Sequence, residues 1–148
     1  MSSVFHMEFS GYFHHGEWEK LAQSPGVFCV YAGKDDPKGT ASPDHILYIG
    51  YANHCVATRL KTHERLKLWN HFLLRDETLC FSSSAVPVPD NARCAAALIN
   101  YHKPHANREY KINFPFEDTS IQLSGDIFAL TPEFTVHSKK HSTPSSQT

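Results

Sequence analysis

Two short apolar runs near the middle of the chain constrain its fold more than any other sequence feature. Residues 27–31 (VFCVY) and residues 45–51 (HILYIGY) are rich in the β-branched and aromatic side chains that favour strands. A polar segment that contains glycine and proline, residues 33–44, separates the two runs. The sequence therefore predicts a β-hairpin with a long connection.

Helix and strand signals alternate along the rest of the chain. Residues 17–23 predict a short helix before the hairpin. Asn53 is the expected cap of a helix that starts at residue 54 and bends near Glu64, and Asp90 is the expected cap of a helix over residues 91–102. Two further strands are expected, and they span residues 78–88 and residues 126–130.

This order of elements predicts an α+β fold, with a small, mainly antiparallel sheet of three to four strands flanked by helices. A chain of 148 residues is the length of one domain. We expect residues 1–25 to form an N-terminal lead-in and residues 26–132 to form the folded domain. Residues 133–148 end in serine, threonine and proline, which predicts a disordered tail.

Composition and charge exclude several classes of protein. The formal net charge is −1, so binding to nucleic acid has to come from local groups of lysine and arginine. No apolar run approaches the roughly 20 residues of a membrane-spanning helix. The four cysteines form no Cys-x-x-Cys pair, the eleven histidines lack zinc-site spacing, and we recognise no signal peptide. These features favour a soluble, cytoplasmic protein.

Several short motifs occur in a fixed order over residues 26–107. They are Gly26-Val27-Phe28, Tyr48-Ile49-Gly50, Arg59 with His63 one turn later, Leu98-Ile99, Lys103-Pro104 and Asn107. Each motif alone recurs by chance, but the ordered combination is specific. It resembles the GIY-YIG nuclease superfamily, which includes homing endonucleases and the nuclease domain of an excision-repair incision protein. The resemblance covers roughly residues 26–110.

The resemblance implies a metal-dependent DNA endonuclease that hydrolyses phosphodiester bonds. It implies that Tyr48 acts as the base or positions water, that Arg59 clamps the phosphate, and that His63 assists proton movement, while Asn107 orders the site. These residue types also suit the chemistry by themselves, because phosphodiester cleavage needs a base and a cation that stabilises the transition state. Tyr48 serves as a base only if a neighbour such as Arg59 depresses its pKa of about 10.

The position of the expected metal ligand is occupied by Ala95. In the GIY-YIG family a glutamate three residues before the Leu98-Ile99 pair holds one Mg²⁺ or Mn²⁺ ion, and alanine offers no side-chain oxygen. The chain as written is therefore expected to be catalytically dead. An engineered inactive variant is the favoured explanation because Tyr48 and Arg59 are retained, and a natural pseudo-nuclease is the alternative. Asp90 is the nearest upstream acid but suits the helix cap better.

Three further positions depart from the family pattern. Phe28 stands where the first motif usually ends in tyrosine, Arg59 follows Gly50 by one extra residue, and Tyr51 stands where a lysine is common. Tyr31 cannot replace the missing hydroxyl, because an offset of three residues along a strand places it on the opposite face from Phe28.

The expected partner is DNA, double-stranded or branched in the leading hypothesis, with single-stranded DNA or RNA left open. A homodimer is also left open, and a membrane partner is not expected. The basic residues expected to contact phosphates are Lys61, Arg65, Lys103, Arg108 and Lys111.

Two other functions compete with the endonuclease. One is a nucleic-acid-binding pseudo-nuclease, in which the same basic residues bind phosphates and Ala95 is native. The other is an interaction protein that uses the aromatic N-terminal segment as a docking surface, with Phe5, Phe9, Tyr12 and Phe13 exposed.

Overall fold

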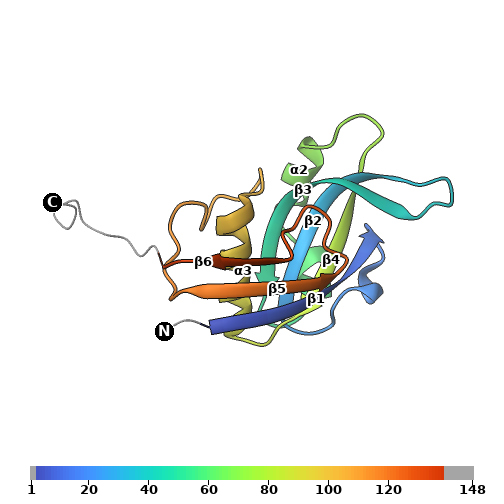
Figure 1. Ribbon diagram of the computed structural model, residues 1–148. Coiled ribbons are helices and arrows are strands. Elements are labelled where there is room, and N and C mark those ends of the chain that lie inside the picture. The colour runs from blue at the N-terminus through green and yellow to red at the C-terminus, as the bar shows by residue number, and fades with distance from the viewer. Residues whose placement is uncertain (1–2, 139–148) are drawn as a thin grey trace.

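The computed structural model describes residues 3–138, which form a six-stranded sheet and three α-helices (Figure 1). The strands are β1 (Ser3–His14), β2 (Gly26–Asp35), β3 (Ala41–Ala52), β4 (Thr78–Ala85), β5 (Thr119–Gly125) and β6 (Glu133–Val136). The helices are the 3₁₀ turn η1 (Trp18–Lys20), α1 (Val56–Lys61), α2 (Leu66–His71) and α3 (Asp90–His102). None of these helices is long and apolar enough to cross a membrane.

The strands lie in the order β3-β2-β4-β1-β5-β6, and the sheet is mixed. Strand β2 pairs antiparallel with both β3 and β4. Strand β1 changes partner along its length: residues 3–9 pair parallel with β5, and residues 10–14 pair antiparallel with β4. The α+β class is confirmed, but the expected small sheet of three to four mainly antiparallel strands is wrong, because β1, β5 and β6 extend it.

The N-terminal segment is an integral strand of the sheet, so its expected role as a lead-in is wrong. Phe5, Met7 and Phe9 point into the core and alternate with exposed His6 and Glu8. This period of two residues is the signal of a strand with one buried face.

The C-terminal elements also differ from the expectation. The last strands are β5 and β6, and residues 126–130 form the connection between them in place of the expected strand. Strand β6 lies inside the segment expected to be a disordered tail, because Phe134 and Val136 pack into the core. The rest of the expected tail, residues 139–148, lies outside the described residues.

The two faces of β2 support two separate apolar clusters. Val27, Cys29 and Tyr31 belong to a cluster around α3, whereas Phe28 and Val30 belong to a cluster beneath α1 and α2. A strand covered on both faces is apolar at successive positions, which explains the unbroken run in the sequence. The prediction that Tyr31 and Phe28 face opposite sides is confirmed.

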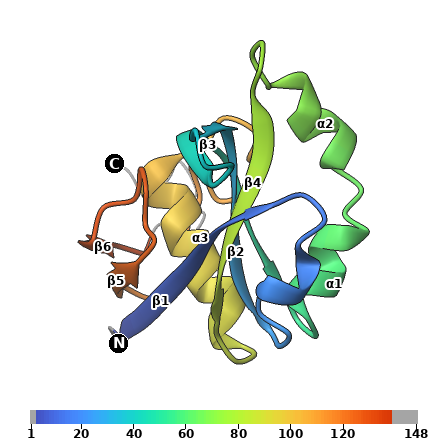
Figure 2. The same ribbon diagram turned by 90° about the vertical axis from the view of Figure 1, so that its right-hand side faces the viewer.

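The curled sheet encloses α3 (Figure 2). This helix contacts β2 and β3 on one side and β5 and β6 on the other, and eight of its 13 residues are buried. The small side chains of residues 94–97 (CAAA) let the strands approach the helix closely, and all four residues are fully buried. Position 95 is therefore part of the core.

Helix breaks are predicted correctly, whereas helix caps are not. The chain breaks between α1 and α2 near Glu64, as expected, and α3 ends at Lys103 in the left-handed conformation, with φ of 50°.

Helix α1 starts at Val56 without a side-chain cap, and Asn53 instead accepts a hydrogen bond of 3.1 Å from Asn91 Nδ2. Asp90 is the first residue of α3 and makes no side-chain cap bond, so both predicted caps are wrong. The helix expected over residues 17–23 is reduced to η1.

The aromatic residues of β1 pack into the protein. Phe9 is buried beside α3, Phe5 and Tyr12 pack against the same cluster, and Phe13 packs against the other cluster. The Tyr12 hydroxyl accepts a hydrogen bond of 2.8 Å from the backbone N–H of Phe128. These contacts leave no exposed aromatic docking surface here, so that interpretation is wrong.

Candidate functional site

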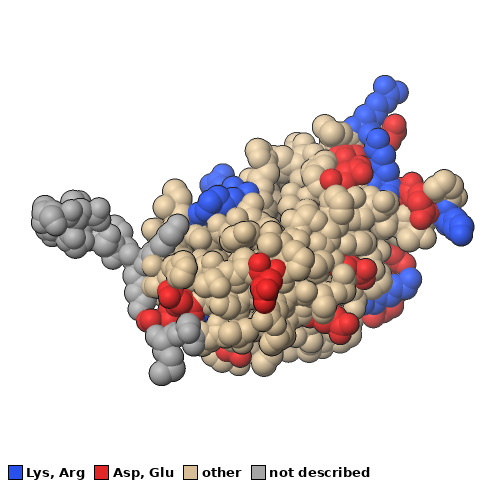
Figure 3. Space-filling model, in the orientation of Figure 1, with Lys and Arg blue, Asp and Glu red and all other residues tan. Residues whose placement is uncertain are grey.

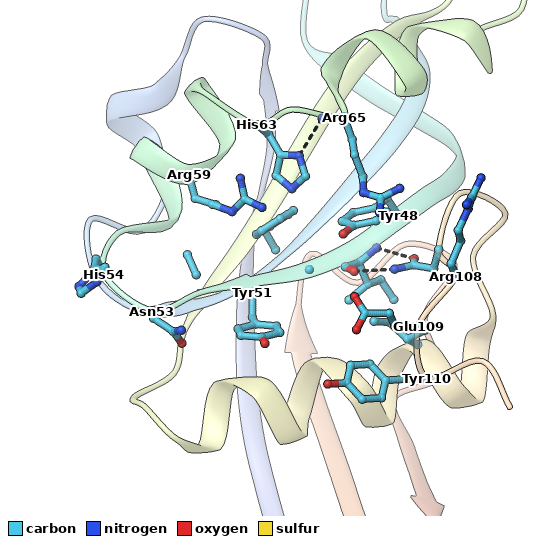
Figure 4. Close-up of a pocket in the computed structure, with 16 residues that line it drawn as sticks. Tyr48, Tyr51, Asn53, His54, Arg59, His63, Arg65, Arg108, Glu109 and Tyr110 are labelled. Atoms are coloured by element: carbon cyan, nitrogen blue, oxygen red, sulfur yellow. Dashed lines mark hydrogen bonds between the residues drawn. The ribbon is translucent and has the colours of Figure 1, made fainter. Parts of the chain in front are cut away.

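A pocket of about 420 Å³ lies at β3, the edge strand of the sheet (Figure 4). This volume is within the roughly 300–1,000 Å³ of typical small-ligand sites. The pocket brings together residues from β3, α1, the turn between α1 and α2, and the loop after α3. Its polar and aromatic lining consists of Tyr48, Tyr51, Asn53, His54, Arg59, His63, Arg65, Asn107, Arg108, Glu109 and Tyr110, with Phe28 and Ile99 beneath.

Tyr48 lies within a group of aromatic rings. Its ring centroid is 5.1 Å from Trp69, 5.7 Å from His63 and 6.2 Å from Phe28. Burial raises the pKa of the Tyr48 hydroxyl above 10, although Arg65 and Arg59 act in the opposite direction. Arg59 therefore does not produce the depressed pKa that a tyrosine base requires, and Tyr48 is a neutral hydrogen-bond donor at neutral pH.

Gly50 makes room for these rings. A Cβ atom at this position would lie 2.5 Å from Phe28 Cζ and 2.9 Å from Tyr48 Cε2, closer than van der Waals contact allows. The Phe28 ring therefore fills the space that a side chain at position 50 would occupy. Phenylalanine at position 28 forms the floor beneath Tyr48.

His63 is a buried, neutral imidazole. Its Nδ1 accepts a hydrogen bond of 3.1 Å from the backbone N–H of Arg65, and its side chain is 2% exposed. Burial lowers the pKa of His63 to about 4, and the nearby charge of Arg59 acts in the same direction. At neutral pH the proton is therefore on Nε2, where it can be donated to an acceptor in the pocket. Proton relay near neutral pH is not supported.

The lowered pKa of His63 makes the stability of the fold depend on pH. The unfolded imidazole has a pKa of about 6.5, so the unfolded chain takes up the proton first as the pH falls. The stabilisation is fully present above about pH 6.5 and is lost as the pH falls towards 4.

When the pH falls from about 7 to about 4.5, the free energy of unfolding of the parent should fall by about 2 kcal/mol more than that of His63→Gln. Urea denaturation at the two pH values measures this difference. Burial also lowers the pKa of His102, but His102 is present in both proteins and does not affect the comparison. Equal losses in the two proteins would show that His63 is not a buried neutral group.

Arg59 is held at the mouth of the pocket by Glu64. Its two terminal nitrogens donate to the Glu64 carboxylate at 2.8 and 3.0 Å, which lowers the pKa of Glu64 to about 2. The Arg59 side chain is 38% exposed and that of Glu64 is 67% exposed. An exposed pair of this kind contributes about 0–1 kcal/mol, so another anion can displace the carboxylate.

The five basic residues expected to contact phosphates separate into two groups. Arg65 lines the pocket with its guanidinium 5.9 Å from the centre of the Tyr48 ring, and Arg108 also belongs to the lining. The Lys103 ammonium donates to the carbonyls of Asn100, at 2.8 Å, and Lys111. Lys111 Nζ in turn donates to a backbone carbonyl of the same loop.

Lys103 and Lys111 therefore fasten the loop after α3 and do not line the pocket. Lys61 is exposed at the end of α1 and is also outside the lining.

Asn107 joins the loop after α3 to the edge strand. Its Oδ1 accepts the N–H of Ile49 and its Nδ2 donates to the carbonyl of Ile49, both at 2.9 Å. The side chain replaces a neighbouring strand at the edge of the sheet, so its amide atoms are already engaged. Asn107 thereby fixes β3 against the loop that carries Arg108 and Glu109.

The side chain at position 95 cannot hold a Mg²⁺ or Mn²⁺ ion. Such ions take about six oxygen ligands, and waters and substrate phosphates commonly supply several of them. Ala95 is fully buried and does not line the pocket, and Glu64 is paired with Arg59. Within residues 3–138 no group of three or more His, Cys, Asp or Glu side chains is arranged to hold a metal ion. Glu109 supplies a carboxylate in the lining, and an ion held there would take its other oxygen ligands from water and phosphate.

Five polar or aromatic residues of the lining were not predicted as site residues from the sequence: Tyr51, Asn53, His54, Glu109 and Tyr110. Glu109 and Tyr110 follow Asn107 of the motif within three positions, and this proximity is the feature of the sequence that could have indicated them. Tyr51 was noticed only as a departure from the family pattern.

Comparisons of the chain with protein-family models, with curated proteins and with solved structures gave no match. The function is therefore inferred from the pocket. The pocket combines guanidinium groups, neutral hydrogen-bond donors, aromatic rings and the carboxylate of Glu109.

Proposed function

We propose that this chain is a non-catalytic nucleic-acid-binding domain whose GIY-YIG-like pocket holds a DNA phosphodiester. The supporting observation is that Arg59, Arg65 and Arg108 line one pocket, while residues 3–138 contain no group of three or more His, Cys, Asp or Glu side chains arranged to hold a metal ion. The face over β1, β5 and β6 is largely uncharged with scattered acidic side chains (Figure 3), so it is less suited to a polyanion.

The phosphodiester is held by donors of two kinds. The Arg59 guanidinium binds two phosphate oxygens through parallel N–H groups, in the way that it now binds the Glu64 carboxylate. Arg65 adds a second positive charge beside Tyr48. The Tyr48 hydroxyl and the Nε2–H of His63 are neutral donors directed at the same region, as Figure 4 indicates.

The same groups bind a phosphate without hydrolysing it. Hydrolysis requires a base that removes a proton from water, and burial keeps Tyr48 protonated at neutral pH. His63 already uses Nδ1 as an acceptor and carries its proton on Nε2. Neither Tyr48 nor His63 is therefore available as a general base, which supports binding of the strand without cleavage.

A metal-dependent endonuclease that lost its glutamate at position 95 is the second candidate. The observation in its favour is that Tyr48, Arg59, His63 and Asn107 all line one pocket, although 59 residues separate the first from the last. This candidate requires that a carboxylate at position 95 reaches the pocket, whereas Ala95 is enclosed in the core. We therefore propose that the alanine is native.

Binding of fluorescein-labelled DNA, followed by anisotropy with Mg²⁺, Mn²⁺ or a chelator, tests the proposal. We expect affinity to be similar in all three conditions and to fall with salt, because it depends on phosphate contacts. The DNA should be intact when recovered. Binding that requires the metal, or recovery of cut strands, would support the endonuclease instead.

Glu64→Gln is expected to strengthen DNA binding by about threefold to fivefold, because it removes the carboxylate that competes with phosphate for Arg59. Glu8→Gln is the matched control, since it makes the same charge change at an exposed position on β1. Anisotropy at constant salt measures both affinities. Equal gains in the two variants would mean that net charge, and not the Arg59–Glu64 pair, controls binding.

A further inference from the structure

The pocket has two chemically different walls because it extends around the edge of β3. Tyr48 and Tyr51 are separated by three positions, so they point to opposite faces of the strand. The first wall carries Arg59 and Arg65 beside Tyr48. The second wall, on the side of α3, carries Tyr51, Glu109 and Tyr110, as Figure 4 shows.

The two tyrosines of the second wall form an aromatic surface. Tyr51 and Tyr110 are half-buried, pack against the cluster around α3 and line the pocket. In Figure 4 both rings lie on the side of the pocket that faces α3. Such rings provide stacking surface for a nucleobase, and they lose little side-chain freedom on binding.

The backbone holds Tyr110 in an unusual conformation. Its φ angle is 63°, in the left-handed region that non-glycine residues rarely adopt. The buried Asn100 side chain donates a hydrogen bond of 2.8 Å to the Tyr110 carbonyl and fixes this conformation. Strained backbone of this kind concentrates at ligand sites, where it directs a side chain.

Glu109 separates the two walls. Burial is the main cause that raises the pKa of Tyr48 and of Tyr110, and the charge of Glu109 acts in the same direction on both. In Figure 4 the carboxylate lies between the two rings. It repels a second phosphate and accepts hydrogen bonds from amino groups, which cytosine carries and thymine lacks.

We infer that the second wall receives one unpaired base of single-stranded DNA, stacked on Tyr51 and Tyr110, while the adjoining phosphate lies at Arg59. This inference rests on the proposed function and adds a ligand class to it. A duplex keeps its bases paired and stacked, whereas a single strand can turn one base into a pocket of about 420 Å³. Glu109 gives the wall a preference for cytosine over thymine.

Affinities for labelled single strands and duplexes of about 15 nucleotides test the inference. We expect Tyr51→Leu and Tyr110→Leu each to lower single-strand affinity by about fivefold or more, because base stacking on the ring is lost. Tyr51→Phe should restore the affinity, since it retains the ring. Tyr101→Leu is the matched control, because Tyr101 is exposed at the end of α3 and outside the pocket.

The same assay tests the base preference. Oligo-dC should bind more tightly than oligo-dT, and Glu109→Ala should remove the difference.

The variants separate this inference from the proposed function. If Arg59→Gln weakens binding while both leucine variants keep the affinity of the parent for single strands, the proposed function stands and the base-binding wall is wrong. If Arg59→Gln leaves binding unchanged, the phosphate site and the inference that depends on it are both wrong. Selective loss of single-strand binding in the leucine variants, together with loss in Arg59→Gln, supports both.

Discussion

Replacing Arg59 by glutamine is expected to weaken DNA binding by roughly 10- to 150-fold, because it removes a bidentate, charge-assisted contact that contributes about 1.5–3 kcal/mol. Fold stability should change by less than about 1 kcal/mol. The reason is that the ion pair lost, with Glu64, is exposed and worth little.

Lys61→Gln is the matched control for Arg59→Gln. Lys61 lies on the same helix and loses the same charge, but it is outside the pocket lining. We expect Lys61→Gln to lower the affinity by about twofold at constant salt. We expect Arg59→Gln to reduce the salt dependence of binding by the equivalent of about one phosphate contact. Similar losses in both variants would show that Arg59 acts through general attraction and not through a specific contact.

The substitution Ala95→Glu is expected to destabilise the fold by about 3–5 kcal/mol, because a carboxylate in the core of α3 has no cation or hydrogen-bond donor to compensate for lost hydration. Position 95 is fully buried between two sides of the sheet, among Cys94, Ala96 and Leu98. The change should also fail to produce cleavage of supercoiled plasmid with Mg²⁺ or Mn²⁺.

Ala92→Glu is the control for this change. Ala92 lies in the first turn of the same helix and is half-buried, and a negative charge is favourable there, so we expect an effect of about 1 kcal/mol or less. Urea denaturation gives both free energies. If Ala95→Glu is as stable as the parent and cuts plasmid only with metal, position 95 reaches the pocket and the endonuclease account replaces ours.

Local sequence signals predicted the hairpin and the helices that follow it. The apolar runs in β2 and β3, the break near Glu64 and the end of α3 at Lys103 each depend on neighbouring residues. The alternation of Phe5, Met7 and Phe9 carried the same kind of signal for β1 and was overlooked. The role of β1 as a bridge between β4 and β5 could not be predicted, because both partners are distant in the sequence.

The sequence predicted which residues line the pocket better than it predicted their protonation and hydrogen-bonding states. Motif order identified Tyr48, Arg59, His63 and Asn107, and all four line the pocket. Their states depend on contacts that the order does not specify. The pairing of Arg59 with Glu64, the acceptor role of His63 Nδ1 and the bonds from Asn107 to the backbone of β3 arise only in the folded chain.

The proposed phosphate contacts of Lys103 and Lys111 illustrate the same limit of sequence reasoning. A basic residue near a motif suggests attraction to a polyanion. In the fold these two side chains donate to backbone carbonyls of the loop after α3. The sequence does not reveal which lysines have such carbonyls within reach.

The most direct test of our account is a ¹H–¹⁵N NMR titration of the chain with a single-stranded oligonucleotide in the presence of Mg²⁺. We predict that the largest shift changes occur at the amides of residues 48–51, 59–65 and 107–110, which border the pocket, and that the oligonucleotide stays intact. Shift changes centred on β1, β5 and β6, or recovery of a cleaved strand, would contradict a non-catalytic phosphodiester pocket at β3.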